Sequence, residues 1–287
     1  NSRMPSPEKV VSRPSPYPLR DRSKKPLPFE VPVWASEKTY NTCIVDCFLS
    51  MLQCAKWQNP MFSSFVKGQS KFTKACKEFL DSQKGDMENR KEIFIGKLFK
   101  ADKAGEFNLE GEEMDVILDK AKEASTISVS SHCSRCNKKR TSTKDYFYGG
   151  RTPGRSPADM MFDSIAKADR RHRCDDPTHC TGAEKVVDLS VTDETWMIPI
   201  DLSQGDLKAN KISVLPHAIE IAGTMFRLTG VSLYSPGHYT CVLHDKIDWF
   251  YYDGIIQPAL KRSKDIKTLV FDPICKIKIA YYLRSIE

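Results

Sequence analysis

A histidine and an aspartate near the end of the chain lie in two strand-like segments that could bring them together. His238 begins HYTCVLH and Asp253 ends IDWFYYD, and both segments are rich in β-branched and aromatic residues. If they form a hairpin that turns at residues 245–246, His238 and Asp253 face each other directly, with Cβ atoms roughly 4.5–5.5 Å apart. The aspartate could then accept a hydrogen bond from the imidazole, fix its tautomer and stabilise the imidazolium.

Two alternatives stand beside this reading of the hairpin. Asp-Lys is not a favoured two-residue turn, and a longer loop that shifts the register by one residue would separate the pair. A His–Asp pair can also serve structure alone. The alternation of the hairpin further predicts an apolar face that a core could bury, made of Tyr239, Cys241, Leu243, Phe250 and Tyr252.

Cys43 is the candidate nucleophile, because it lies where the helical pattern CIVDCFLSMLQ begins. The free N–H groups and the dipole of a helix N-terminus lower the pKa of a thiol. Cys47, one turn further along, gains less from the dipole, and either cysteine could instead be a small buried apolar residue. The order Cys43, His238, Asp253 is papain-like: the histidine would take the thiol proton and later protonate the leaving amine.

Two close cysteine pairs suggest a metal site. SHCSRC contains Cys133 and Cys136 with two residues between them, and CDDPTHC contains Cys174 and Cys180 with five, together with His179. Four thiolates, or three with His179 as an alternative ligand, would close a tetrahedral structural Zn²⁺ site without an open position for a catalytic water. The alternative is two reactive thiol pairs in a loop.

The elements that must position these residues follow from composition and pattern. Residues 1–30 are rich in Pro and Ser and hold seven Lys/Arg against three Asp/Glu, so we expect a disordered or surface-draped basic arm. Residues 43–124 have helical patterns, and the segments after residue 125 are mostly strand-like, with one short helix expected at 156–170. Helices first and strands later predict an α+β fold.

Bulk properties exclude some classes of function. The 287 residues are 40% hydrophobic and 28% charged, which is ordinary for a globular protein, and no apolar run approaches the length that crosses a bilayer. The net charge of +7 comes with no basic stripe interleaved with aromatics, so we expect no specific nucleic-acid partner and no membrane partner. Ten cysteines without a signal-peptide core favour a reducing, intracellular compartment, nuclear or cytoplasmic, and we expect a monomer.

Several motifs together resemble the ubiquitin-specific-protease family. YNTCIVDCFLSMLQ is similar to the Cys box of that family, and GHYTCVLHDKIDWFYYDG is similar to its His box. MFRLTGVSLYSPGHY and the closing KIAYYL resemble the strands around the His box and at the end of the domain, so the resemblance covers roughly residues 34–287. Asp46-Cys47 replaces the usual Asn-Ser, a variant that resembles the divergent branch acting on SUMO.

The resemblance implies a papain-like fold within residues 31–287, with a helical thumb (31–124), zinc-bearing fingers (125–200) and a β-rich palm (201–287). It assigns Cys43 as nucleophile, His238 as base and Asp253 as third triad member. It also implies a cleft for the C-terminal Gly-Gly tail of the modifier, lined by Trp34, Gly237 and Tyr239. The usual oxyanion donor position holds Lys38 here, so Asn41 and the backbone N–H of Cys43 are the substitutes.

The implied function is that of a cysteine isopeptidase that cleaves a ubiquitin-like modifier, SUMO preferred, after its Gly-Gly end. SUMO or ubiquitin and their conjugates are then the partners. A deubiquitinase and a catalytically inactive modifier-binding scaffold are the alternatives. A papain-like protease of ordinary peptides would leave the cysteine pairs unexplained.

Overall fold

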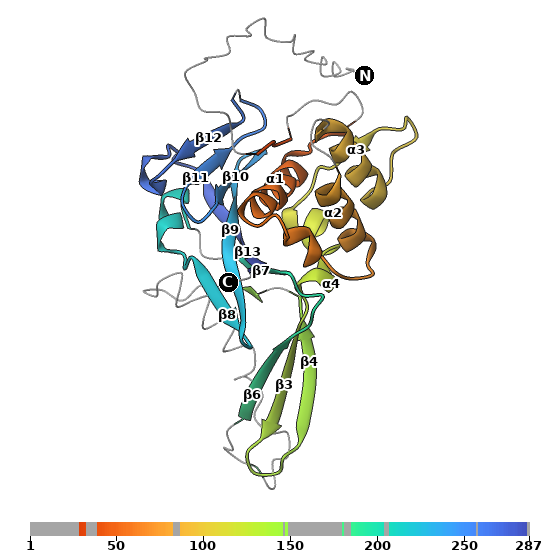
Figure 1. Ribbon diagram of the computed structural model, residues 1–287, viewed down its shortest axis with the longest axis vertical. Coiled ribbons are helices and arrows are strands. Elements are labelled where there is room, and N and C mark those ends of the chain that lie inside the picture. Colours follow the sequence, from red (N-terminus) through yellow and green to blue (C-terminus); the bar gives the residue numbers. More distant parts are fainter. Residues whose placement is uncertain are drawn as a thin grey trace, which may run out of the picture.

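The computed structural model describes residues 29–32, 39–82, 87–145, 147–148, 180, 185–203, 207–256 and 258–285. A helical layer lies against one face of a large sheet, and a small sheet projects away from both (Figure 1). None of the helices in this part of the chain combines the length and the apolar character that crossing a bilayer requires.

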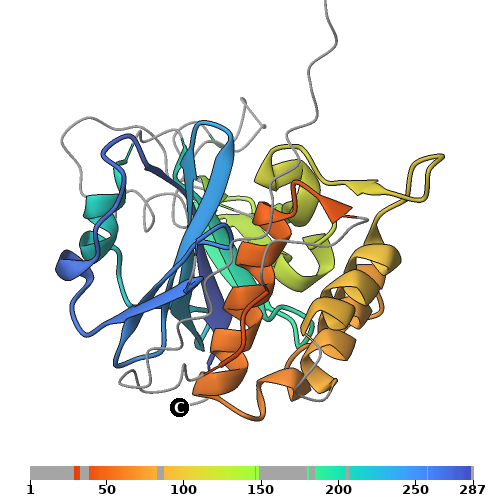
Figure 2. The ribbon, with the colours of Figure 1, turned by 90° about the horizontal axis from the view of Figure 1, so that it is seen from above.

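The helical layer is built around α1 (Cys43–Gln58), which is buried on all sides from Ile44 to Ala55. It runs between the large sheet and the other helices (Figure 2), which explains why its apolar residues do not form a single stripe. The other helices are α2 (Lys71–Asp81), α3 (Met87–Leu98) and α4 (Lys122–Ser125), with a 3₁₀ turn at Phe62–Ser64 and a π-helical turn at Met114–Leu118.

The large sheet contains eight strands, and seven of them follow the order β12-β11-β10-β9-β13-β7-β5 while β8 pairs with β9. Most neighbours are antiparallel, and β5 and β7 are parallel. The strands are β5 (Phe147–Tyr148), β7 (Met197–Asp201), β8 (Ala218–Ile221), β9 (Thr224–Ser235), β10 (His238–His244), β11 (Trp249–Tyr252), β12 (Leu260–Ser263) and β13 (Lys276–Arg284).

The small sheet has the antiparallel order β4-β3-β6, formed by β3 (Ile127–Cys133), β4 (Lys139–Lys144) and β6 (Lys185–Val191). Two-residue strands β1 (Thr39–Tyr40) and β2 (Phe107–Asn108) pair in parallel beside the start of α1. This pairing holds the segment before α1 against the loop after α3.

Both faces of the large sheet are covered. One face packs on α1 and the rest of the helical layer, and the other packs on 3₁₀ turns at Ala209–Val214 and Ile266–Thr268. A buried carboxylate ties the first interface together: Glu113 accepts hydrogen bonds of 2.5 Å from Ser232 Oγ on β9 and from Tyr281 on β13. Burial raises the pKa of Glu113 to about 7, against the effect of these two donors.

The mixed architecture with several sheets is compatible with the α+β class predicted from the order of helical and strand-like segments. Within residues 43–124, where helical patterns were expected, the chain has a break between the 3₁₀ turn and α2. Ser70 accounts for the break, because its side chain accepts from the N–H of Thr73 and caps α2. The globular contacts begin inside the expected arm, since Phe29 is buried edge-on against Phe250. The helix expected at 156–170 lies outside the described residues.

Candidate active site

Cys43 is the first residue of α1, as the helical pattern predicted. Thr42 is the N-cap residue, and its carbonyl accepts the first helical hydrogen bond from the N–H of Asp46 at 2.8 Å. The N–H groups of the first turn therefore point toward the surroundings of the thiol. Cys43 is partly exposed, whereas Cys47 is buried. Burial, followed by hydrogen bonding with Cys241, raises the pKa of Cys47 well above its usual value, which leaves Cys43 as the accessible thiol.

His238 is the first residue of β10, and a two-residue loop joins it to the end of β9. Ser235 at the end of β9 pairs with His238, and Pro236 and Gly237 form the loop. The φ of Gly237 is +79°, which the second central position of a type II turn requires. A side chain at Gly237 would strain this turn and displace the histidine that follows it.

The predicted register of the β10–β11 hairpin was wrong. His244 pairs with Trp249 and Cys241 with Tyr252, so four residues, 245–248, form the loop. The loop is stabilised by Asp245, whose Oδ1 accepts from the N–H groups of Ile247 and Asp248 and so competes with the tighter turn. The register shift is two residues instead of one, and it leaves every side chain on its predicted face.

The His238–Asp253 pair survives the shift as a diagonal contact. His238 Nε2 lies 2.9 Å from Asp253 Oδ1, and the same oxygen accepts from the N–H of Ile255 at 3.1 Å. The predicted apolar face is confirmed, because its five residues all belong to the core under α1. The opposite face is also covered, since Val242 and Trp249 pack in the second core.

Charges at the pair favour an imidazolium. Burial of the ring lowers the pKa of His238, but hydrogen bonds to Asp253 and then to Cys43 outweigh burial and raise it to about 9. Burial has the opposite effect on Asp253 and raises its pKa. The hydrogen bonds from His238 and from the Ile255 N–H outweigh burial and lower the pKa of Asp253 below its ordinary value. Because Nε2 faces Asp253, Nδ1 is the ring nitrogen left for the thiol of Cys43.

Cys43 and His238 line a common cavity of about 90 Å³ at the N-terminal end of α1. Gly237 and Tyr239, two of the three residues expected along the modifier-tail cleft, line it as well, and Trp34 lies outside the described residues. The remaining lining residues are Asn41, Asp46, Tyr252, Gly254 and Ile255.

Asn41 lies in this cavity, where an oxyanion donor is expected. Its φ is +54°, a left-handed conformation that asparagine tolerates. Its Nδ2 donates to Asn108 Oδ1 at 2.8 Å, which fixes the side chain and leaves the second N–H of the amide for another acceptor. Lys38, at the usual donor position, lies outside the described residues.

A buried ion pair behind the nucleophile was not predicted. Asp46 Oδ1 lies 2.9 Å from Lys91 Nζ on α3, and both side chains are almost completely buried. Asp46 Oδ2 also accepts from Thr42 Oγ1 at 2.6 Å, so one carboxylate holds both the N-cap and α3. Asp46 was noted in the sequence only as a departure from a motif. Its partner is 45 residues away, and nothing in the pattern of α3 distinguishes Lys91 from exposed lysines.

A thiol cluster lies at the far end of the small sheet. The Sγ atoms of Cys133, Cys136 and Cys180 lie within 4.8 Å of one another, a separation that could hold a metal ion. Cys133 is the last residue of β3, Cys136 lies in the turn that leads to β4, and Cys180 precedes β6. Backbone N–H groups of Cys136 and Arg135 lower the pKa of Cys133 to about 6, which favours the thiolate that metals bind. Cys174 and His179 lie outside the described residues.

The site can carry out nucleophilic chemistry: a thiol at a helix start, an imidazole beside it and a carboxylate that orients the imidazole. No model of a known protein family matches the chain, and no curated protein matches it significantly.

Proposed function

We propose that the protein is a cysteine isopeptidase with the nucleophile Cys43, the base His238 and the orienting residue Asp253. The observation that carries the proposal is the 2.9 Å contact between His238 Nε2 and Asp253 Oδ1, beside Cys43 at the start of α1. These residues come from the helical layer and from the large sheet, so catalysis would require the packing of the two layers (Figure 2).

The reaction follows from the positions of the protons. His238 Nδ1 holds the proton that leaves Cys43, and the thiolate attacks the carbonyl carbon of the scissile amide. The oxyanion is stabilised by the backbone N–H of Cys43 and the free amide N–H of Asn41. The imidazolium then protonates the leaving amine, and a water molecule activated by the same imidazole hydrolyses the thioester.

The size of the cavity supports a substrate whose end lacks bulky side chains. A volume of about 90 Å³ beside Cys43 suits a backbone with glycines better than one with large residues. Together with the motifs resembling ubiquitin-specific proteases, this supports a modifier ending in Gly-Gly as the substrate. The Asp46-Cys47 variant makes SUMO the first choice and ubiquitin the alternative.

The thiol cluster supports a structural role for zinc. Three thiolates at the tip of the small sheet leave one position of a tetrahedron for Cys174 or His179. A metal there would join the β3–β4 turn to the segment before β6 and so close the end of a sheet that has only three strands.

The test is hydrolysis of SUMO and of ubiquitin carrying a C-terminal fluorogenic amide. We expect release of the fluorophore from SUMO, with Cys43→Ala reducing kcat/KM by about 10³-fold or more and Cys47→Ala retaining most of the activity. Release from ubiquitin alone would favour the alternative substrate. A folded, metal-loaded protein that hydrolyses neither would contradict the proposal and favour a binding scaffold.

A further inference from the structure

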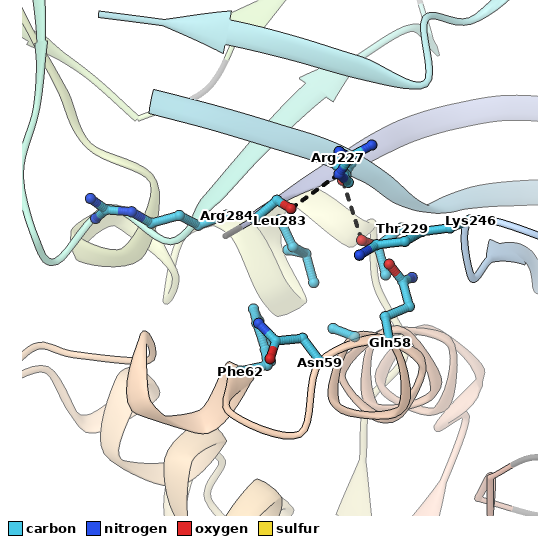
Figure 3. A pocket seen from close by; sticks show the side chains of 10 residues that line it. Gln58, Asn59, Phe62, Arg227, Thr229, Lys246, Leu283 and Arg284 are labelled. Atoms are coloured by element: carbon cyan, nitrogen blue, oxygen red, sulfur yellow. Dashed lines mark hydrogen bonds between the residues drawn. The ribbon is translucent and has the colours of Figure 1, made fainter. Parts of the chain in front are cut away.

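A second cavity, of about 280 Å³, lies between the helical layer and the large sheet at the C-terminal end of α1 (Figure 3). Since α1 has 16 residues and so spans roughly 24 Å, this cavity is distinct from the one at Cys43. We call it the basic cavity. Its lining residues are Ala55, Gln58, Asn59, Phe62, Arg227, Thr229, Lys246, Leu283, Arg284 and Ser285.

Among the described residues, the lining has three cationic residues and no carboxylate. Arg284 is already used, because its Nη1 donates to the carbonyl of Thr192 at 3.2 Å, and Figure 3 shows its side chain turned away from the others. Arg227 and Lys246 are therefore the two cations that face the cavity. Among the described residues, neither has a carboxylate within ion-pair distance.

Arg227 is held in place with part of its guanidinium free. Its Nε donates to Ser285 Oγ at 3.1 Å, so the side chain is fixed from β9 toward the end of β13. The terminal nitrogens have no partner in the described part of the chain, and they form the fork that binds two oxygens of one anion. Lys246 lines the same cavity, and Figure 3 shows its side chain crossing that of Thr229.

Uncharged donors complete the other side of the basic cavity. Asn59 Oδ1 accepts from the N–H of Met61 at 3.1 Å, which leaves its Nδ2 as a donor. Gln58 Nε2 is engaged with the carbonyl of His244 and contributes less. Two cations with an amide donor match a tetrahedral oxyanion.

The partial negative charge at the C-terminal end of α1 balances only part of the positive charge of the cavity. The C-terminus of a helix carries roughly half a negative charge, which one lysine would more than balance. In the described part of the chain, no carboxylate neutralises the guanidinium of Arg227 on the opposite strand. A bound anion would neutralise the positive charge that the helix end leaves unbalanced.

We propose that the basic cavity is an anion site that takes the phosphoryl group of a small molecule, either inorganic phosphate or a phosphomonoester. Its oxygens would accept from Arg227, Lys246 and Asn59, and the bound group would fasten the end of α1 to β9 and β13. This inference does not depend on the isopeptidase activity.

The test is titration calorimetry of the full chain with inorganic phosphate and, separately, with O-phosphoserine, at constant ionic strength set with chloride. We expect one site per chain, and Arg227→Gln and Lys246→Gln should each weaken binding by about tenfold or more. Lys103→Gln, the same charge change at an exposed lysine, should leave the affinity unchanged.

The two ligands distinguish the source of the phosphoryl group. Binding of both supports a phosphomonoester, and binding of inorganic phosphate alone supports the free ion. Heat no greater than that of chloride in a folded sample would overturn the proposal. Equal weakening by Lys103→Gln and Arg227→Gln would do the same, because it would show nonspecific attraction to the net positive charge. Circular dichroism spectra of the variants verify that they are folded.

Discussion

The protonation of His238 decides how the candidate site works near neutral pH. An ordinary histidine has a pKa of about 6.5, and here the partners Asp253 and Cys43 outweigh burial and raise it to about 9. The folded protein thus keeps the ring charged at pH 7, beside a thiol at a helix N-terminus. A charged ring is the form that can protonate the leaving amine.

Replacing Asp253 tests this account of His238. In Asp253→Asn the ring loses its anionic partner, so its pKa falls and the basic limb of kcat/KM, near pH 9 in the wild type, should move to lower pH. We also expect kcat/KM to fall by about 10²-fold or more at pH 7. The measurement is a pH profile of hydrolysis from pH 5 to 10.

The same substitution changes stability with a defined sign. Because the folded pKa of His238 is raised, its contribution to stability is complete below about pH 6.5 and is lost as the pH rises through about 9. Asp253→Asn should therefore reduce the free energy of unfolding at pH 6 more than at pH 10. An equal reduction at both values would show that Asp253 acts through packing alone.

The residues of the site could be predicted from the sequence, but the register of the hairpin that carries two of them could not. Cys43 could be placed at a helix start because a helical pattern begins there. His238 and Asp253 could be placed on one face because alternation along a strand survives a two-residue shift. The loop length could not be predicted, since it depends on the hydrogen bonds of Asp245 inside the folded hairpin.

At the level of elements, α1 is positioned by the buried Asp46–Lys91 pair as well as by apolar packing. Removing the lysine would leave a buried carboxylate without its partner. Lys91→Met should destabilise the protein by about 3–5 kcal/mol, measured by chemical denaturation at pH 7. Lys97→Met on the same helix removes an exposed pair with Glu78 and should cost less than about 1 kcal/mol.

The double variant Asp46→Leu/Lys91→Met separates charge from packing. It replaces both ions with apolar groups of similar size, so it should recover most of the stability lost in Lys91→Met. If the double variant is as unstable as the single one, the lysine stem contributes more than the ion pair does.

We expect the small sheet, unlike the large sheet, to depend on a metal bound at the thiol cluster. A metal at the thiol cluster would tie the β3–β4 turn to Cys180, so its removal should loosen that end of the sheet. We expect native protein to contain about one equivalent of zinc. Chelation should speed amide hydrogen exchange in β3, β4 and β6 and leave α1 protected.

Less than half an equivalent of metal in native protein would contradict this site. Exchange that increases equally in α1 and in β3 would show that the metal supports the whole fold. Substituting Cys133 with Ser should reproduce the effect of chelation, whereas Cys76→Ser, at a buried cysteine of α2 outside the cluster, should not change metal content.

For the whole molecule, the order of helices and strands could be predicted from the sequence. The long-range contacts that hold these elements together could be predicted only in part. Strand-like segments after residue 125 became strands because β-branched and aromatic alternation marks them in the sequence. Strands β4 and β12 were missed, since KRTSTK and LKRS are polar edge segments without that signal. The Glu113 contacts to β9 and β13 join residues 119 and 168 positions apart, which no local pattern reveals.

The packing of the two layers places the thiol at one end of α1 beside the His–Asp pair of the β10–β11 hairpin. The proposed activity depends on this arrangement. The most direct measurement uses SUMO with an electrophile at its C-terminus, followed by mass spectrometry of the adduct. We expect one covalent adduct per chain, attached to Cys43, absent in Cys43→Ala and retained in Cys47→Ala. An adduct on Cys47, or labelling that persists in Cys43→Ala, would contradict it.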